Sequence, residues 1–191
     1  TTRVPTIAVW SRRDGAGWSR PSGVTVRDCR VTGNIRIWGM GAGGSMRDLL
    51  ASSRTPGHTR VAQAAAPTQV RIERVRFEAT GTIPLCVGPG VTRTTVTGST
   101  FAGRSTSTAI YLDAESAGAE IRGNVFAIRT GREQIAVDGS GANRIVDNRF
   151  ALHGQGGIFL YRNCGEDGVI RHQTPSYNQI TDNVFSGAAW L

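Results

Sequence analysis

Short segments in which apolar and polar residues alternate occur along the whole chain, and turns rich in glycine, aspartate and asparagine separate them. In the stretch 133–150, the segments IAVD (135–138) and RIVDNRF (144–150) flank the turn sequence GSGAN. Alternation with a period of two predicts half-buried β-strands, and segments this short do not form stable helices. Because such strands are not stable alone, the chain must pair many of them.

One six-residue pattern returns at a nearly constant interval. It is found at 26–31 (VRDCRV), 72–77 (IERVRF), 96–101 (VTGSTF), 121–126 (IRGNVF), 145–150 (IVDNRF) and 180–185 (ITDNVF). The four middle copies end at Phe77, Phe101, Phe126 and Phe150, which are 24, 25 and 24 residues apart, whereas the first and last steps are 46 and 35 residues. A second series interleaves with it at 7–10 (IAVW), 35–38 (IRIW), 83–86 (IPLC), 110–113 (IYLD), 135–138 (IAVD) and 158–161 (IFLY). Two interleaved series with one period predict a repeat unit of two or three short strands.

This repeat predicts an all-β fold, a right-handed single-stranded parallel β-helix of about six to seven coils that forms one domain over residues 1–191. Coils of such a solenoid stack about 4.8 Å apart, so equivalent residues become neighbours. Asn124, Asn148 and Asn183 share one position, and we expect their amides to form an asparagine ladder. Cys29 occupies the same position in an earlier copy, where we expect a small buried side chain.

Two long segments, at 39–69 and 161–179, interrupt the period. The first contains MRDLLAS, which favours a short helix, and extra length of this kind on a regular scaffold usually forms the wall of a cleft. A solenoid also needs its ends covered, and we find neither a capping helix nor a closing strand. We therefore expect either a fragment of a longer chain that lacks one or both end caps, or a homo-oligomer in which another subunit covers the open ends.

The formal net charge is +8, and all 22 basic residues are arginine. A basic surface favours acidic partners such as uronate polysaccharides, whereas scattered arginines without interleaved aromatic residues argue against nucleic acid. No window of about 18 apolar residues is present, so we predict no membrane span. The first residues lack the features of a secretory signal peptide, which leaves open that one was removed. The three cysteines fit no metal-binding spacing.

The outward positions of the second series hold the candidate chemistry. In register, they form a column of Trp10, Trp38, Cys86, Asp113, Asp138 and Tyr161, with Tyr111 beside it. Asp138 lies over Asp113, and two carboxylates this close raise one pKa unless a cation lies between them. Asp113, Asp138 and the nearby Glu115 could bind Ca²⁺, or Asp113 and Asp138 could hydrolyse a glycosidic bond as an acid and a nucleophile or base. They could equally be solvated turn residues.

Residues of the 161–179 segment lie one rung from Asp138 and extend the candidate site. They are Arg162, Asn163, Glu166, Arg171 and His172. His172 is a conventional acid or base because its ordinary pKa is near 6.5. Outward aromatic rings suit stacking on sugar rings. We therefore expect substrate contacts from Trp38, Tyr111, Tyr161, Asn163 and Glu166.

The I-x-G/D-N-x-F repeats, interleaved with I-x-h-D strands, resemble the right-handed β-helix proteins of the pectate-lyase-like superfamily over roughly residues 5–187. The resemblance implies a substrate groove on the strand face with the two aspartates. In pectate lyases, calcium acidifies the uronate C5 proton and an arginine removes it. Arg162 is the first choice for that arginine here and Arg171 the second. The complete aspartate constellation of those lyases and the aspartate and histidine motifs of polygalacturonases are not found.

Together these features predict a secreted or periplasmic protein that acts on an acidic polysaccharide as a lyase or C5-epimerase. Two alternatives stay open. The chain could be a non-catalytic glycan-binding or structural module, like an adhesin or a tailspike, or it could be a glycoside hydrolase that uses Asp113 and Asp138.

Overall fold

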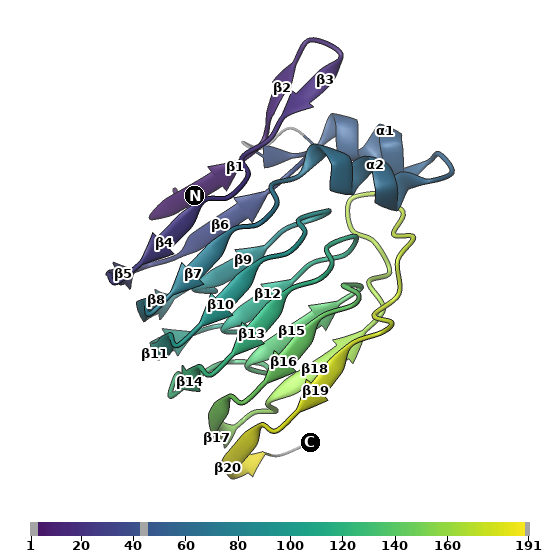
Figure 1. Cartoon of the computed structure of the whole chain (residues 1–191). Helices are drawn as coiled ribbons and strands as arrows, with labels where there is room; N and C mark the ends of the chain where they lie inside the picture. The colour runs from purple at the N-terminus through teal and green to yellow at the C-terminus, as the bar shows by residue number, and fades with distance from the viewer. Residues whose placement is uncertain (1–3, 43–45, 190–191) are drawn as a thin grey trace.

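The structure is a computed structural model that describes residues 4–42 and 46–189, and its chain winds through six stacked rungs (Figure 1). Each rung gives one strand to each of three parallel sheets. The first sheet contains β1 (Ile7–Trp10), β6 (Ile35–Trp38), β9 (Leu85–Val87), β12 (Ile110–Leu112), β15 (Ile135–Asp138) and β18 (Ile158–Tyr161). The second contains β4 (Thr25–Arg27), β7 (Arg71–Glu73), β10 (Thr95–Thr97), β13 (Glu120–Arg122), β16 (Arg144–Val146) and β19 (Gln179–Thr181). The third contains β5 (Arg30–Thr32), β8 (Arg76–Gly81), β11 (Thr100–Ser105), β14 (Val125–Phe126), β17 (Arg149–Gly154) and β20 (Val184–Ala189).

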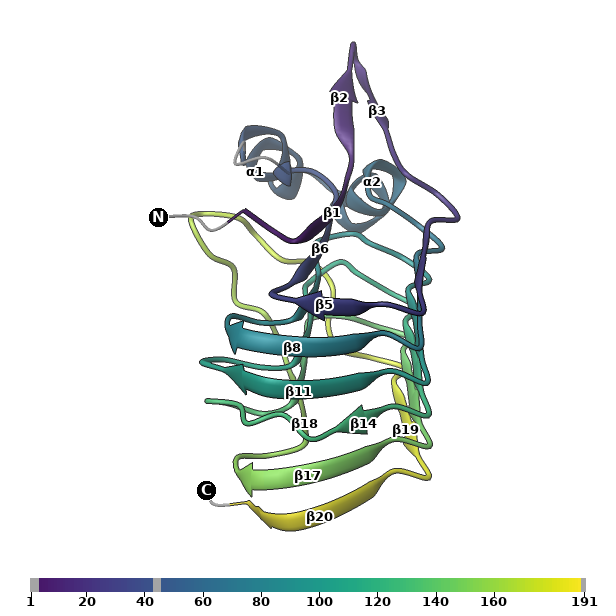
Figure 2. The same ribbon diagram turned by 90° about the vertical axis from the view of Figure 1, so that its left-hand side faces the viewer.

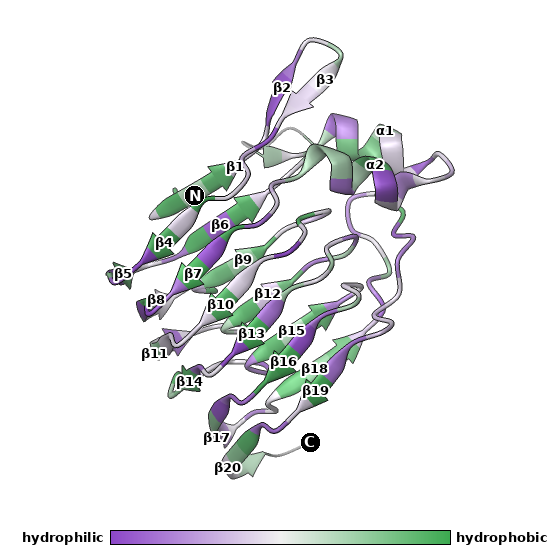
Figure 3. Ribbon diagram, viewed as in Figure 1, coloured by the Kyte–Doolittle hydropathy of each residue, from purple (hydrophilic) through white to green (hydrophobic). Residues whose placement is uncertain are grey.

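The predicted parallel β-helix is therefore confirmed, and apolar and polar positions alternate along its strands (Figure 3). Inward residues form continuous rows along the axis. The rings of Phe77, Phe101, Phe126, Phe150 and Phe185 stack with centroids 4.6–4.8 Å apart and interplanar angles of 3–10°. This spacing equals that between paired strands, so the ring stack follows directly from the backbone register.

The corner between the second and third sheets explains why the repeat contains glycine or aspartate before asparagine. In every rung this residue has a positive φ, between 50° and 64°: Asp28, Arg74, Gly98, Gly123, Asp147 and Asp182. Glycine adopts this left-handed conformation without strain, and aspartate tolerates it better than most residues. The corner thus depends on local backbone geometry as well as on packing.

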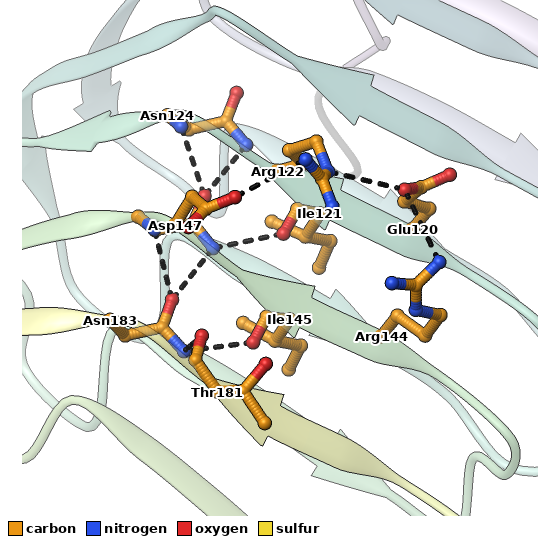
Figure 4. A network of polar contacts seen from close by, with 10 residues as sticks. Glu120, Ile121, Arg122, Asn124, Arg144, Ile145, Asp147, Thr181 and Asn183 are labelled. Atoms are coloured by element: carbon orange, nitrogen blue, oxygen red, sulfur yellow. Dashed lines mark hydrogen bonds and ion pairs between the residues drawn. The ribbon is translucent and has the colours of Figure 1, made fainter.

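The predicted asparagine ladder lies directly after that corner (Figure 4). Asn148 is fully buried, and its Nδ2 donates to Asn183 Oδ1 (2.9 Å) and to the carbonyl of Ile121 (2.9 Å). Its Oδ1 accepts the backbone N–H and the Nδ2 of Asn124, both at 3.0 Å. The amides of Asn124 and Asn148 therefore each satisfy polar groups of two neighbouring rungs, whereas Asn183, in the last rung, satisfies those of one.

A second asparagine pair, which the sequence analysis missed, lies at the corner between the first and second sheets. Asn143 is buried, and its Nδ2 donates to Asn178 Oδ1 at 2.8 Å, while its Oδ1 accepts the backbone N–H of Ala119 at 2.9 Å. The sequence contains a signal for this pair, because Asn143 and Asn178 each precede by two residues the isoleucine that begins a copy of the six-residue pattern.

Cys29 differs from its predicted environment. It is exposed, although it occupies the ladder position of its rung. The first rung is stacked on one side only, so this position lacks the second neighbour that buries Asn124 and Asn148 in the middle of the solenoid.

Three insertions leave the solenoid at one corner, the connection from the first sheet to the second (Figure 2). In the first rung the insertion is a hairpin of β2 (Arg12–Asp14) and β3 (Gly17–Ser19). In the second rung it contains α1 (Arg47–Ser53) and α2 (His58–Ala65), of which only α1 was predicted. In the sixth it is the segment 162–178, which we call the strap. Because equivalent corners stack, insertions far apart in sequence meet on one side of the solenoid.

The sixth rung exposes part of the apolar interior. Leu160, Ile180 and Phe185 continue buried rows, yet they are 40%, 39% and 46% exposed. A homo-oligomer that covers this end stays a prediction. Among the described residues, neither helix is long and apolar enough to cross a membrane.

The ladder yields a stability prediction. Replacing Asn148 by alanine should lower the free energy of unfolding by about 3 kcal/mol, because buried groups on both neighbouring rungs lose their partners. Denaturant unfolding measures the change. Arg149→Ala, on an exposed neighbouring side chain, serves as the control and should change stability by less than about 0.5 kcal/mol. Equal stability of Asn148→Ala and the parent protein would contradict a structural role for the ladder.

Candidate functional site

The register of the first sheet defines an outer column of six positions: Trp10, Trp38, Gly88, Asp113, Asp138 and Tyr161. Asp113 and Asp138 are neighbours in it, as predicted. Cys86 is not a member, because β9 begins two residues later than expected. Pro84 has no N–H to donate to a strand ladder, so the strand starts after it and Gly88 takes the predicted place of Cys86.

Asp138 is held by two side chains from other rungs. Its Oδ2 accepts hydrogen bonds from the hydroxyl of Tyr111 and from Nδ2 of Asn163 at 2.9 Å. The residue is only 7% exposed, and its Oδ1 is buried with no hydrogen-bond partner in the described part of the chain. Burial raises the pKa of Asp138, and the two hydrogen bonds oppose that shift.

Asp113 lies beside a buried arginine. Its Oδ1 accepts the backbone N–H of Ala114 at 2.7 Å and lies 3.8 Å from Nη2 of Arg171. Burial raises the pKa of Asp113 from 3.8 to about 7, while Arg171 and the Ala114 N–H act in the opposite direction. The negative charge of Asp138 adds to the increase. The pKa values of two neighbouring carboxyl groups are thus raised above the ordinary value of aspartate.

The strap brings Arg171 to this pair. Its guanidinium is buried, and Nε and Nη1 have no partner among the residues that the structure describes. A cavity of about 490 Å³ lies next to it, lined entirely by strap residues 162–165 and 168–171. A buried guanidinium with unused N–H groups is a strong binding partner for a carboxylate.

The other strap candidates occupy different places. Arg162 lines the same cavity but is exposed, and no ion pair joins it to Asp113 or Asp138 in the described residues. Glu166 is also exposed. His172 lies further along the strap, where its Nε2 is 2.8 Å from the carbonyl oxygen of Ser53 in α1. The structure therefore places Arg171, rather than Arg162, against the carboxyl pair, and it places His172 at the helices.

Glu115 faces away from the two aspartates and fixes the strap. It is fully buried with φ +64°, and it accepts hydrogen bonds from the Thr59 hydroxyl and from the backbone N–H groups of His172 (2.7 Å) and Gln173 (3.3 Å). Gln173 Nε2 also donates to the carbonyls of Ser116 and Gly139 at 2.7 and 2.8 Å. The backbone turn after Asp113 thus places Glu115 where its carboxylate joins the solenoid to α2 and to the strap by hydrogen bonds.

As arranged, Asp113, Glu115 and Asp138 do not fit a calcium site. Ca²⁺ takes six to eight oxygen ligands. Here Asp113 faces a guanidinium, one oxygen of Asp138 is occupied by donors, and Glu115 points elsewhere. In residues 4–42 and 46–189, no group of three or more His, Cys, Asp or Glu side chains is placed to hold a metal ion. Calcium binding stays a prediction from the sequence.

The aromatic residues in the column and beside it are the two tyrosines, Tyr111 and Tyr161, and the two tryptophans, Trp10 and Trp38. Tyr111 and Tyr161 use their hydroxyls internally, Tyr111 on Asp138 and Tyr161 on Glu133 Oε1 at 2.8 Å, and burial raises the pKa of both phenols. Trp38 packs across Gly88, where an added Cβ would lie 2.7 Å from its ring carbons. Trp10 is more open at 38% exposure.

The pKa of Asp113 yields a pH prediction. Because the folded protein holds this proton more tightly than the unfolded chain, Asp113 should lower stability as the pH rises from about 4 to about 7. The ¹³C signal of its carboxyl group should titrate with a midpoint of about 7. Asp113→Asn should remove that signal and reduce the loss of stability. Asp28, whose pKa Arg74 holds below the ordinary value, is the internal control. A midpoint of Asp113 near the ordinary 3.8 would contradict the burial effect.

Comparison with known proteins agrees with this architecture. A family described as "Right handed beta helix region" matches residues 15–190. Searches of curated proteins and of solved structures each found no match. The matched segment runs from the hairpin to β20, so it contains nearly the whole solenoid. The chain therefore belongs to the right-handed β-helix family.

Proposed function

We propose that this protein is an extracytoplasmic enzyme that acts on an acidic polysaccharide by β-elimination or C5 epimerisation. One observation carries the proposal: Asp113 and Asp138 are buried neighbours with raised pKa values, next to the buried Arg171. Such a cluster is costly to bury and adds little to stability, and perturbed carboxyl groups of this kind concentrate at functional sites.

The chemistry of the cluster suits proton abstraction next to a uronate carboxylate. In the proposal, the free N–H groups of Arg171 bind that carboxylate and so make the C5 proton more acidic. Asp113, with a pKa of about 7, accepts the proton, since a base works best when its pKa lies near the working pH.

Tyr111 supplies the second proton transfer, and Asp138 positions its hydroxyl. The raised pKa of Tyr111 keeps its hydroxyl protonated, and Asp138 orients it. In elimination, the C4–O4 bond breaks, the C4–C5 double bond forms, and the leaving O4 takes the Tyr111 proton. Water then returns a proton to Tyr111 and removes the C5 proton from Asp113. In epimerisation, the C5 carbanion is reprotonated on its other face instead. Both reactions share the abstraction step.

The substrate class follows from charge. The chain carries a formal net charge of +8, which attracts polyanions. Polysaccharides rich in uronic acids lie outside the cytoplasm, and the proposed secreted or periplasmic location rests on this substrate class.

A second candidate, a non-catalytic glycan-binding module, is favoured by the cover over the cluster. Asp113 is only 6% exposed, and Asp138 and Asn163 are also buried. A substrate reaches Asp113 only if the strap moves, so a rigid strap would leave the cluster a structural element and the outer surface a binding face.

The two candidates differ in turnover. The protein should form unsaturated uronates, seen by ultraviolet absorbance, or exchange C5 hydrogen for deuterium, seen by NMR, with at least one polymer among pectate, alginate and glycosaminoglycans. Trials with and without Ca²⁺ test the predicted ion. New reducing ends without unsaturation would indicate a hydrolase that uses Asp113 and Asp138.

Single substitutions test whether the cluster of Asp113, Asp138 and Arg171 carries out the reaction. Asp113→Asn and Arg171→Gln should each lower the rate about 10²-fold or more, the usual contribution of an acid or base group. Asp182→Asn, on an exposed carboxylate at a distant corner, is the matched control and should keep full activity. Absence of both unsaturation and exchange with every polymer would refute the enzyme and leave the binding module.

A further inference from the structure

A second cavity lies outside the proposed catalytic cluster, where the hairpin β2–β3 leaves the first rung. Its volume is about 550 Å³, within the range of small-molecule sites. It is lined by Trp10, Ser11, Arg12, Arg13, Trp18, Ala42 and Asp48. These residues come from β1, the hairpin, the chain after β6 and α1, so the cavity exists only because two insertions meet at one corner.

Two tryptophans give the cavity aromatic surface. Trp10 is 38% exposed at the start of the outer column. Trp18 packs on the cluster formed by Met40, Leu49 and the helices, which fixes its ring. Rigid, partly exposed indole rings stack on the apolar faces of sugar rings at little cost in side-chain entropy.

Charged groups stand beside these rings. The Arg13 guanidinium lies 5.8 Å from the centre of the Trp18 ring and 3.7 Å from Asp48 Oδ1. Arg12 is exposed, and it forms no ion pair or side-chain hydrogen bond within residues 4–42 and 46–189. Arg12 is thus available for an anion, while Asp48 can accept a hydroxyl hydrogen.

Ser11 provides an independent sign of a ligand. It lines the cavity and is 5% exposed, and its Oγ is buried with no hydrogen-bond partner in the described chain. A buried hydroxyl without a partner is costly, and a bound polar group removes that cost.

We propose that this cavity is a saccharide subsite that binds a uronate unit, with Trp10 and Trp18 on the ring faces, Arg12 on the carboxylate and Ser11 on a hydroxyl. The inference rests on the proposed substrate class. Trp10 and Asp113 belong to the same outer column, three rungs or about 14 Å apart. A polysaccharide that runs parallel to the solenoid axis therefore reaches both sites, and the cavity selects chains over single sugars.

Titration with uronate oligosaccharides from pectate and alginate tests the subsite. Neutral malto-oligosaccharides of equal length are the comparison, and the indole N–H signals of the four tryptophans, assigned with Trp→Phe variants, are the readout. The uronates should shift the Trp10 and Trp18 signals saturably. Arg12→Ala and Trp10→Ala should each weaken binding about tenfold. Arg104→Ala, an exposed arginine on β11 with the same charge change, should bind like the parent.

The outcomes separate this inference from the proposed function. Unchanged affinity in Arg12→Ala, equal binding of neutral oligosaccharides, or shifts confined to other tryptophans would each overturn the subsite. Binding at Trp10 and Trp18 without turnover supports the subsite and counts against the enzyme. Turnover with unaltered binding in both variants supports the enzyme and overturns the subsite. Arg12→Ala carries the test if Trp10→Ala fails to fold.

Discussion

The parallel register between neighbouring rungs is the constraint on which the rest of the structure depends. It turns residues about 24 positions apart into touching neighbours, and it stacks the phenylalanine rings and the asparagine amides at the spacing of paired strands. The apolar rows supply the buried area, whereas the amides satisfy corner groups that would otherwise be buried without partners. On the outer face of the first sheet, the same register places Asp113 beside Asp138.

A second organising feature is that all three insertions leave the solenoid at the same corner. The hairpin, the two helices and the strap all leave the connection between the first and second sheets, at the ends of the strands that carry the outer column. The strap runs from the sixth rung to α1, the insertion of the second rung, where Ile170 N–H donates to Ser53 Oγ at 3.1 Å. Glu115 of the fourth rung holds the strap between these two points. The scaffold thus supplies fixed positions, and the insertions supply Arg171, Asn163 and the cover that raises the pKa of both aspartates.

The sequence was sufficient to predict the features that the repeat determines. The fold, the ladder of Asn124, Asn148 and Asn183 and the Asp113–Asp138 pair all follow from period and alternation. Features that depend on loop conformation could not be predicted from the repeat. The turn at Glu115 reverses its side chain, and only the path of the strap decides that Arg171 rather than Arg162 meets Asp113. Cys86 is displaced from the outer column because β9 begins after Pro84, and a pattern of apolar residues does not reveal this local constraint.

Chemical cross-linking tests the central claim, the stacking register, most directly. Thr97 and Arg122 are partners on neighbouring rungs of the second sheet, about 4.8 Å apart, and Glu73 lies one rung before Thr97. With the exposed Cys29 and Cys164 replaced by serine, a Thr97→Cys, Arg122→Cys protein should be joined rapidly by a short thiol cross-linker. The Glu73→Cys, Arg122→Cys protein, whose sites are also accessible but about twice as far apart, should not. Equal cross-linking of the two pairs, or none in the first, would contradict the register and with it the placement of Asp113 against Asp138.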